Sequence, residues 1–271
     1  MKKLRNAKWL PMLVWIGGMI ALWEVGALVV ASTKRTPENV LPHLYQIIAA
    51  IFDNKPVNGG QTAIMVVLGS AGKTILRAFY GFAAGTILGF MLALIMKLSR
   101  IAEKLIFPYL MLVQMIPILG MAPIILSITG DINKSRIVIA AILTFYPVAT
   151  NTLAGFNAVE HEKHELMHSY AASKFTVYTK VLIPYSVPYF FTGLKISAPM
   201  AITASILVDT LQGDGGLGSM LSQSLKHGMS IYVFWLIVFF SAFIGIFSSK
   251  LMGMIEKLFS PQKRKKRGNG V

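Results

Sequence analysis

Six stretches of mostly apolar residues, each about 20 residues long, dominate this chain. They lie at about residues 9–31, 79–97, 106–127, 136–156, 187–208 and 231–252. An α-helix needs about 20 apolar residues to cross the ~30 Å hydrocarbon core of a bilayer, and a helix satisfies its own backbone hydrogen bonds there. The sequence therefore predicts an all-α membrane protein with six transmembrane helices.

Little length remains for a separate soluble domain. Of the 271 residues, 55% are hydrophobic and only 14% are charged. We expect a single domain over 1–271, in which residues 9–256 form the six-helix membrane part. Residues 1–8 and 257–271 are its flanking segments, and the second of these is strongly basic.

The basic residues are distributed unevenly between the two sides of the predicted spans. Net charge is +15, and with the N-terminus inside, the inner segments hold sixteen lysines and arginines against eight in the outer segments and their borders. Positive charge collects on the cytoplasmic side of membrane proteins. This bias places both termini in the cytoplasm, with the basic tail at the anionic inner leaflet. It argues against a nucleic-acid partner.

The first apolar stretch is expected to remain in the protein as a helix, because it is longer than the core of a secretory signal and no clear A-x-A site follows it. The largest outer segment follows, at about residues 32–78. Apolar spacing predicts a short helix at His43–Phe52 and a second amphipathic piece at 62–78 that leads into the next span.

Two prolines and a polar pair mark the third span as a candidate pathway lining. Pro117 and Pro123 each remove a backbone donor and favour a kink, and Gln114 and Met115 lie just before the first. Freed carbonyls at membrane depth are tolerated against protein or a water-filled cavity. A kinked packing helix is the alternative. Pro147 predicts a similar break in the fourth span, and Asn151 near its inner end is a further pathway candidate.

Small residues in the second span predict close helix packing. Gly81, Gly85 and Gly89 recur every four residues, which lets another helix approach closely in lipid. A ligand path along this ridge is the alternative.

Three charged residues within or beside the spans have two interpretations each. Asp209 ends the fifth span and is expected near the interface or facing a cavity, where it is a candidate substrate contact. Glu24 in the first span is expected to pair with a basic residue such as Arg77. Lys195 either reaches toward the inner interface or meets an anionic solute.

Nucleotide-binding motifs, metal sites and cofactor sites are not indicated. GSAGKT at 69–74 is two residues short of the phosphate-binding loop, and GDGGLG at 213–218 follows a hydrophobic helix rather than a strand. His161, His164 and His168 share a helix face but lack matching acidic or cysteine ligands. No catalytic residue is expected. Any ATP hydrolysis must occur in another chain.

The most specific signal is the inner segment between the fourth and fifth spans, from Glu160 to Ser197. It contains a polar helical run, a turn of small residues, a second helical run and an Ile-Pro stop. This order resembles the coupling loop of ABC-transporter inner-membrane permeases, E-A-A, three residues, Gly, nine residues, I-x-L-P. The loop is expected at 160–185, with coupling residues at Glu165, Leu166, Met167, Ala171, Ala172, Ser173, Val181, Ile183 and Pro184.

Register with that pattern is kept at both ends. Glu165 takes the place of its Glu, and Pro184 that of its Pro, while Leu166 and Met167 replace the two alanines. Ala171 stands where the pattern has Gly. Gly permits a positive φ at the turn and Ala resists it, so the turn geometry is open.

The resemblance extends over nearly the whole chain, to the nitrate/sulfonate/taurine/bicarbonate group of these permeases. It is carried by LWEVG, VLPHLYQII, ILRAFYGFAAGTILGF, QMIPILGMAPIIL, FYPVATNTLAGF and DGGLG. It implies a type I importer permease that forms a homodimer in the inner (plasma) membrane. The partners it implies are two ATP-binding subunits and an extracytoplasmic solute-binding protein.

The substrate implied is a small nitrate-, sulfonate- or taurine-like anion. A thiamine-pyrimidine or riboflavin-like compound is an alternative, because members of this architecture carry those too. A secondary transporter is a rival class, against which stand the coupling pattern and the lack of an obvious inverted repeat. A membrane enzyme is another, against which stands the lack of a convergent polar set.

Overall fold

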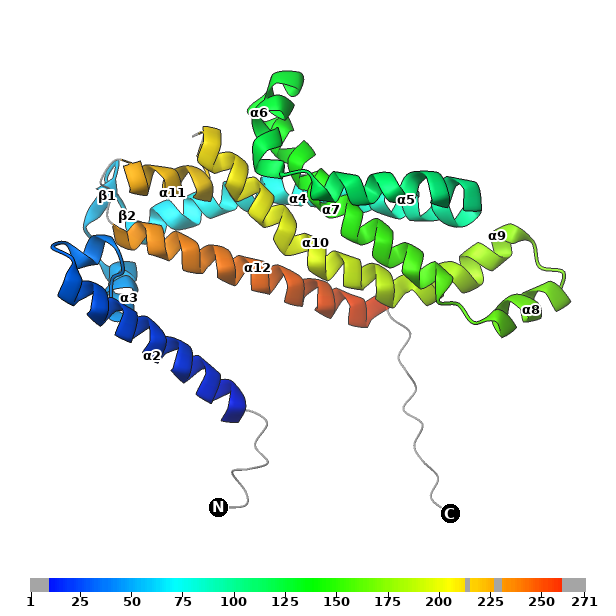
Figure 1. The fold of residues 1–271 in the computed structure, drawn as a ribbon, viewed down its shortest axis with the longest axis horizontal. Coiled ribbons are helices and arrows are strands. Elements are labelled where there is room, and N and C mark those ends of the chain that lie inside the picture. The colour runs from blue at the N-terminus through cyan, green and yellow to red at the C-terminus, as the bar shows by residue number, and fades with distance from the viewer. Residues whose placement is uncertain (1–9, 213–214, 227–230, 260–271) are drawn as a thin grey trace, which may run out of the picture. The chain divides into compact units, whose positions relative to one another are not determined.

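A computed structural model describes residues 10–212, 215–226 and 231–259, and it is helical apart from one short hairpin among those residues (Figure 1). The long helices are α2 (Leu10–Thr33), α4 (Ala63–Leu98), α5 (Arg100–Met115), α7 (Ile132–Asn157), α10 (Ile183–Gln212) and α12 (Ile231–Phe259). The shorter helices are α3 (Leu44–Phe52), α6 (Ile118–Thr129), α8 (His161–Ser169), α9 (Lys174–Val177) and α11 (Leu217–Lys226). A 3-10 turn η1 (Pro37–Asn39), a π-helical turn η2 (Tyr178–Leu182) and strands β1 (Pro56–Asn58) and β2 (Gln61–Thr62) complete the fold. The expected N-terminal segment 1–8 and most of the basic tail 257–271 lie outside the described residues.

The predicted all-α membrane class is confirmed. Within the described part of the chain, five helical segments are long and apolar enough to cross a bilayer: α2, α4, α7, Lys174–Leu211 and α12. A sixth span results if α5 and α6 are counted together, although they are bent by 111°. The third predicted span is thus two helices rather than one kinked helix. Pro117 lacks an N–H and holds Ile116 in an extended conformation, so the helix ends there.

The amphipathic piece at 62–78 leads into the span at 79–97 as predicted, and the two form one continuous helix, α4, of 36 residues. Another expectation about helix boundaries is wrong. Pro147 does not break the fourth span, since α7 is helical over 26 residues. The side-chain amide of Asn151 donates to the Pro147 carbonyl at 2.8 Å, and Thr150 donates its hydroxyl to Tyr146 at 2.9 Å. Such side-chain bonds and neighbouring helices support a proline within a membrane helix.

The chain forms two compact units, which are considered separately. The first comprises residues 1–70 and 220–239. In it, Trp23 of α2 packs edge-on against Trp235 of α12 with ring centroids 4.7 Å apart, and its indole N–H donates to the Pro42 carbonyl at 3.0 Å. The Tyr232 hydroxyl donates to Glu38 at 3.0 Å. Aromatic contacts and these two hydrogen bonds connect α2 and α12 to the segment before α3.

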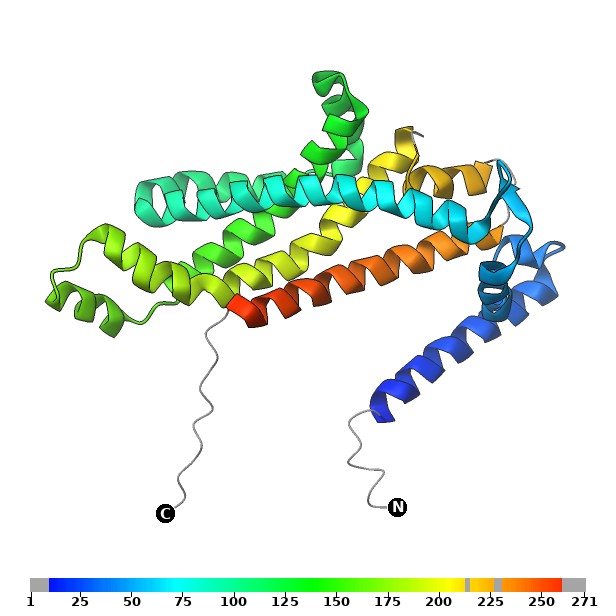
Figure 2. The same ribbon diagram turned by 180° about the vertical axis from the view of Figure 1, so that it is seen from behind.

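The second unit, residues 71–219 and 240–271, is built around α7. A Cβ at Gly81 would lie 2.3 Å from the Cβ of Ala140, and one at Gly85 would lie 2.6 Å from the Ala141 carbonyl oxygen. The glycine ridge of α4 therefore packs directly on α7, which confirms the packing interpretation. Gly155 and Gly193 allow equally close contact between α7 and α10, and these helices run side by side in Figures 1 and 2.

Candidate functional site

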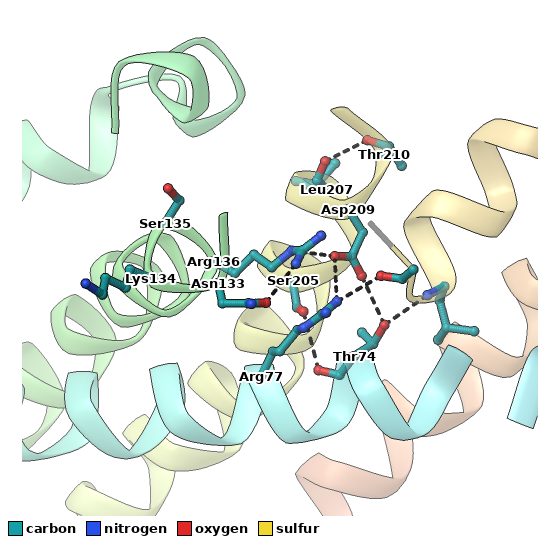
Figure 3. A network of polar contacts seen from close by, with 12 residues as sticks. Thr74, Arg77, Asn133, Lys134, Ser135, Arg136, Ser205, Leu207, Asp209 and Thr210 are labelled. Carbon is teal, nitrogen blue, oxygen red and sulfur yellow. Dashed lines mark hydrogen bonds and ion pairs between the residues drawn. The ribbon is translucent and has the colours of Figure 1, made fainter. Parts of the chain in front are cut away.

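A buried ionic cluster joins three helices of the second unit (Figure 3). Asp209 lies near the end of α10, and Oδ1 of its carboxylate is 2.7 Å from Nε of Arg136 in α7. Both side chains are fully buried. Arg77 of α4, whose side chain is 17% exposed, places Nη1 3.4 Å from the same oxygen. One carboxylate is therefore approached by guanidinium groups from two other helices.

Neutral hydrogen-bonding groups surround the three charged side chains of the cluster. The Thr74 hydroxyl donates to Asp209 Oδ2 at 3.2 Å and accepts the Leu217 backbone N–H at 2.9 Å. Arg77 donates to the Gly215 carbonyl at 2.8 Å, and Arg136 donates to the Asn133 side chain at 3.0 Å. The cluster thus connects α10 to the start of α11 as well as to α4 and α7.

The glycines after α10 are required by this close packing. Gly216 has a φ of +117°, and a Cβ there would lie 2.1 Å from Asp209 Oδ2. A Cβ at Gly218 would lie 1.9 Å from the Ile206 carbonyl oxygen. The glycine-rich turn therefore lets backbone approach a carboxylate. Gly213 and Asp214 of the same motif lie outside the described residues.

The other pathway candidates lie on separate elements. Gln114, Met115 and Pro117 are exposed at the junction of α5 and α6, while Asn151 is half-buried on α7. Asn151 follows Arg136 by 15 residues, which is about 22 Å along the helix axis. The structure thus does not bring Asn151 into the ionic cluster with Asp209.

The loop at 160–185 begins with α8, which ends in a left-handed turn. Ala171 has a φ of +49° and is the one non-glycine residue with a positive φ in the described part of the chain. Its N–H bonds to the His168 carbonyl at 2.9 Å, and the Ala172 N–H bonds to the Met167 carbonyl at 3.0 Å. This pair of bonds defines a Schellman motif, in which the left-handed position is usually Gly. Ala171 adopts the conformation that Gly would favour.

After the turn, the loop continues into α9 and is anchored by its second half. Ser173 caps α9 by accepting the Thr176 N–H at 3.3 Å. Leu182, in the π-helical turn η2, is 2% exposed and packs in a core cluster that includes Phe156 of α7. Val181 and Ile183 are half-buried on either side of it. The end of the loop is therefore fixed to the membrane helices.

The part of the loop before this anchor, α8 and α9, instead presents apolar side chains outward. Leu166, Tyr170 and Phe175 are 55%, 75% and 77% exposed. A groove of about 300 Å³ lies between α8 and the start of α10, and the ammonium group of Lys163 lies 4.4 Å from the centre of the Tyr185 ring at its edge. Met167, Lys180 and Pro184 also line it. An exposed apolar surface on an anchored helix pair is suited to binding a protein partner.

Two further charged side chains within spans, Glu24 and Lys195, have partners that the sequence did not identify. Glu24 contacts His43, with Nδ1 and Oε2 2.6 Å apart, and accepts the Leu44 N–H at 3.0 Å. The basic residue suggested for it, Arg77, pairs with Asp209 instead. Lys195 of α10 forms an ion pair with Glu256 of α12. From the sequence, Lys195 was expected to reach the interface or an anionic solute, and neither expectation included a partner on α12.

Several helices long enough to cross a membrane, close glycine packing and an anchored loop with an exposed apolar surface define a multi-pass helical membrane protein. The sequence pattern of the family described as "Binding-protein-dependent transport system inner membrane component" matches residues 85–263. The chain belongs to this family of ABC importer permeases, and it is a multi-pass inner-membrane protein.

Curated relatives match almost the full length. The chain is 25% identical to the nitrate import permease of Synechococcus elongatus, over 94% of this chain and 91% of that protein. It is 24% identical to the formylaminopyrimidine transport permease of Halalkalibacterium halodurans, over 91% of this chain and 93% of that protein. A putative aliphatic sulfonates transport permease of Bacillus subtilis is 24% identical, over 92% and 86%.

Solved structures share the fold. A chain of an amino acid ABC transporter with histidines superposes with a TM-score of 0.61 at 19% identity, covering 72% of this chain and 94% of that one. An inward-facing methionine ABC transporter chain gives 0.59 at 18% identity, covering 73% and 96%. The predicted type I importer fold is therefore confirmed.

Proposed function

We propose that this chain is the membrane-spanning subunit of an ATP-driven importer, and that the loop at 160–185 binds its ATPase. The observation that carries the proposal is the left-handed turn at Ala171. Ala171 adopts the positive φ that the Gly of the coupling pattern would adopt, although its side chain resists it. The turn therefore holds α8 and α9 at a fixed angle to each other. The residues proposed to act here are Glu165, Leu166, Met167, Ala171, Ala172, Ser173, Val181, Ile183 and Pro184.

A coupling role requires both a contact surface and a rigid connection. Leu166, Tyr170 and Phe175 supply exposed apolar area, and buried Leu182 supplies the connection to α7. A displacement of α8 by a partner is then transmitted to α10 as a rigid-body movement. No covalent chemistry is assigned to this chain, and ATP is hydrolysed in the partner.

The assembly proposed is a homodimer of this chain with two ATP-binding subunits and an extracytoplasmic solute-binding protein. Both termini lie in the cytoplasm, as the excess of basic residues in the inner segments favours. In this arrangement α5, α6, α7 and α10 line the path, with Gln114, Met115, Pro117 and Asn151 as pathway residues. Asp209 acts there through the helices that its ionic cluster holds together.

A small nitrate-, sulfonate- or taurine-like anion is the proposed substrate. Relatives named for nitrate and for aliphatic sulfonates support it. The relatives named for formylaminopyrimidine and riboflavin support the second candidate, a vitamin precursor carried by the same machinery. A secondary transporter, which would need no ATPase, is the rival mechanism. Uptake by the reconstituted complex of labelled nitrate, taurine and formylaminopyrimidine separates the substrates.

The test of the mechanism is co-purification from the protein's own membranes in detergent. The tagged chain is expected to retain an ATPase, and Leu166→Arg is expected to release it because a charge enters the exposed apolar surface. His161→Arg adds the same charge to the same helix about 140° away around its axis and is the matched control. A chain that purifies alone and still moves solute in liposomes would establish secondary transport instead.

A further inference from the structure

One face of α3 carries three large apolar side chains that are exposed in the first unit. Tyr45, Ile48 and Phe52 are 66%, 56% and 78% exposed. Their spacing of three and four residues places them on one side of the helix, while Ile47 on the opposite side is buried. α3 contains no charged residue. This face, here called the α3 stripe, is suited to an apolar environment.

The start of α3 is fixed to α2 at Glu24. The Glu24 carboxylate accepts the Leu44 N–H at 3.0 Å, and its Oε2 lies 2.6 Å from Nδ1 of His43. The segment before α3 also packs on α2, since a Cβ at Gly26 would lie 3.2 Å from Cδ2 of Leu41. The chain therefore leaves the end of α2 and returns along that helix before α3 begins.

Glu24 lies well inside the length of α2 that can cross a bilayer. α2 has 24 residues, and the ~30 Å hydrocarbon core takes about 20 residues of a helix. Wherever that core lies along α2, about five or more of the residues after Glu24 remain inside it, which is about 8 Å of helix. The start of α3 is therefore below the membrane surface.

The polar groups at the start of α3 have partners within the chain. The Gln46 side chain accepts the His43 N–H at 2.9 Å and donates to Glu38 at 3.3 Å. Glu24 accepts the Leu44 N–H. Free donors at a helix N-terminus are costly in hydrocarbon, where no water can bond to them. The start of α3 therefore meets a condition for burial in lipid.

The far end of α3 returns to polar surroundings. Asp53, Asn54 and Lys55 follow the helix directly and are exposed. The nine residues of α3 extend about 14 Å, which is enough to rise from the level of Glu24 to the surface. The α3 stripe thus lies between a start at membrane depth and a polar end.

We propose that α3 is a re-entrant helix of the bilayer and that the α3 stripe contacts lipid acyl chains. The neighbouring part of α2 exposes Val25 and Leu28, so both helices present apolar surface at one level of the membrane. That leaflet is the outer one when both termini are cytoplasmic. Only this choice of leaflet rests on the proposed function.

Two protein occupants fit the α3 stripe less well. A solute-binding protein approaches from water, so the stripe would have to stand in water whenever that protein is absent, and an exposed apolar patch favours aggregation there. A second copy of the chain would have to pack a helix on the stripe within the lipid. Helices approach closely in lipid through small residues, whereas this face presents Tyr45, Ile48 and Phe52.

The experiment is spin labelling of the full-length chain in liposomes. The sequence contains no cysteine, so Ile48→Cys provides a single attachment site for a nitroxide. Oxygen concentrates in hydrocarbon and a polar nickel complex stays in water, and the collision rate of the nitroxide with each is measured. Asp53→Cys, directly after the same helix, is the matched control for water. Leu28→Cys on α2 is the reference for lipid.

At position 48 the collision rate with nickel is expected to be about fivefold or more below that at position 53, because a polar complex is excluded from hydrocarbon. The collision rate with oxygen should match that at position 28. Equal nickel rates at positions 48 and 53 would overturn the proposal, since the stripe would then lie in water. Low rates with both reagents at position 48 would overturn it as well, because protein would then cover the stripe.

The readout is separable from folding and from the proposed function. Ile48 is exposed, so its substitution leaves the core intact, and thermal melting of each variant checks this. The measurement needs neither an ATPase nor a solute. A chain that shows the lipid pattern but purifies without an ATPase would refute the proposed function alone.

Discussion

Nε of Arg136 lies 2.7 Å from Oδ1 of Asp209, and neither side chain is exposed. Two charges from helices 73 residues apart in the sequence thus meet in the interior of a membrane protein. Removing one member of a buried pair leaves the other charge uncompensated, which costs far more than the pair contributes. Arg77 and Thr74 bring α4 to the same carboxylate. The cluster is therefore a point on which the arrangement of three helices depends.

Asp209→Asn is expected to destabilise the protein by about 3–5 kcal/mol, because Arg136 would remain buried beside a neutral amide. Thermal melting in detergent measures the loss. Asp53→Asn is the matched control, since Asp53 is half-exposed and its ion pair with Lys55 spans 3.9 Å. A surface change of this kind alters stability by less than about 0.5 kcal/mol. If the two variants melted alike, the ionic cluster would have no stabilising role.

Ala171→Gly is expected to stabilise the turn after α8 by about 1 kcal/mol, because an L-residue with a side chain is strained in the left-handed region. Hydrogen exchange at the amides of Ala171 and Ala172 measures it, since both bond back to α8. The control, Ala172→Gly, is expected to change the exchange rate in the opposite direction. Ala172→Gly places Gly where no positive φ requires it, and exchange should become faster. Faster exchange in both variants would show that the turn is not left-handed in solution.

Local patterns were sufficient to predict the helical membrane class and the helix-turn-helix of the loop at 160–185. Long apolar runs can form few structures in lipid, so they predict transmembrane helices. The spacing from Glu165 to Pro184 could be matched to the coupling pattern from the sequence alone. Boundaries depending on proline were less predictable. Pro117 ends a helix, whereas Pro147 does not, because side chains such as Asn151 support the backbone around it.

The ionic cluster was missed although the sequence contained a signal for it. Arg77 lies just before the second predicted span, Arg136 begins the fourth, and Asp209 directly follows the fifth. Because successive spans alternate in direction, all three come to the same level of the membrane. Which helices are neighbours, however, depends on packing that a single sequence does not reveal. The partner of Glu24 was likewise sought among arginines, and is His43.

Gly85→Ala is expected to destabilise the second unit by about 1–3 kcal/mol, since the added methyl group would overlap α7. Its Cβ would lie 2.6 Å from both the Ala141 carbonyl oxygen and the Thr144 Cβ. Gly72→Ala, on the same helix, is the control, because a Cβ there meets nothing within 4 Å. That change should instead stabilise α4 by about 0.5–1 kcal/mol. Melting temperatures that rise in both variants would contradict the close contact of α4 with α7.

Glu24→Gln is expected to loosen the start of α3. The Glu24 carboxylate contacts the His43 ring and accepts the Leu44 N–H, so it supplies an acceptor and a negative charge at the first turn of that helix. An amide in its place keeps one acceptor but loses the charge. Hydrogen exchange of the first α3 amides should become about threefold to fivefold faster.

The matched control for that change is Glu38→Gln. Glu38 is an exposed carboxylate in the same unit, and it accepts side-chain donors from Gln46 at 3.3 Å and Tyr232 at 3.0 Å. The Leu44 N–H donates to Glu24 rather than to Glu38. Exchange at the Leu44 amide should therefore stay close to that of the unmodified protein. An equal acceleration by both substitutions would mean that general surface charge, rather than the Glu24 contact, stabilises α3.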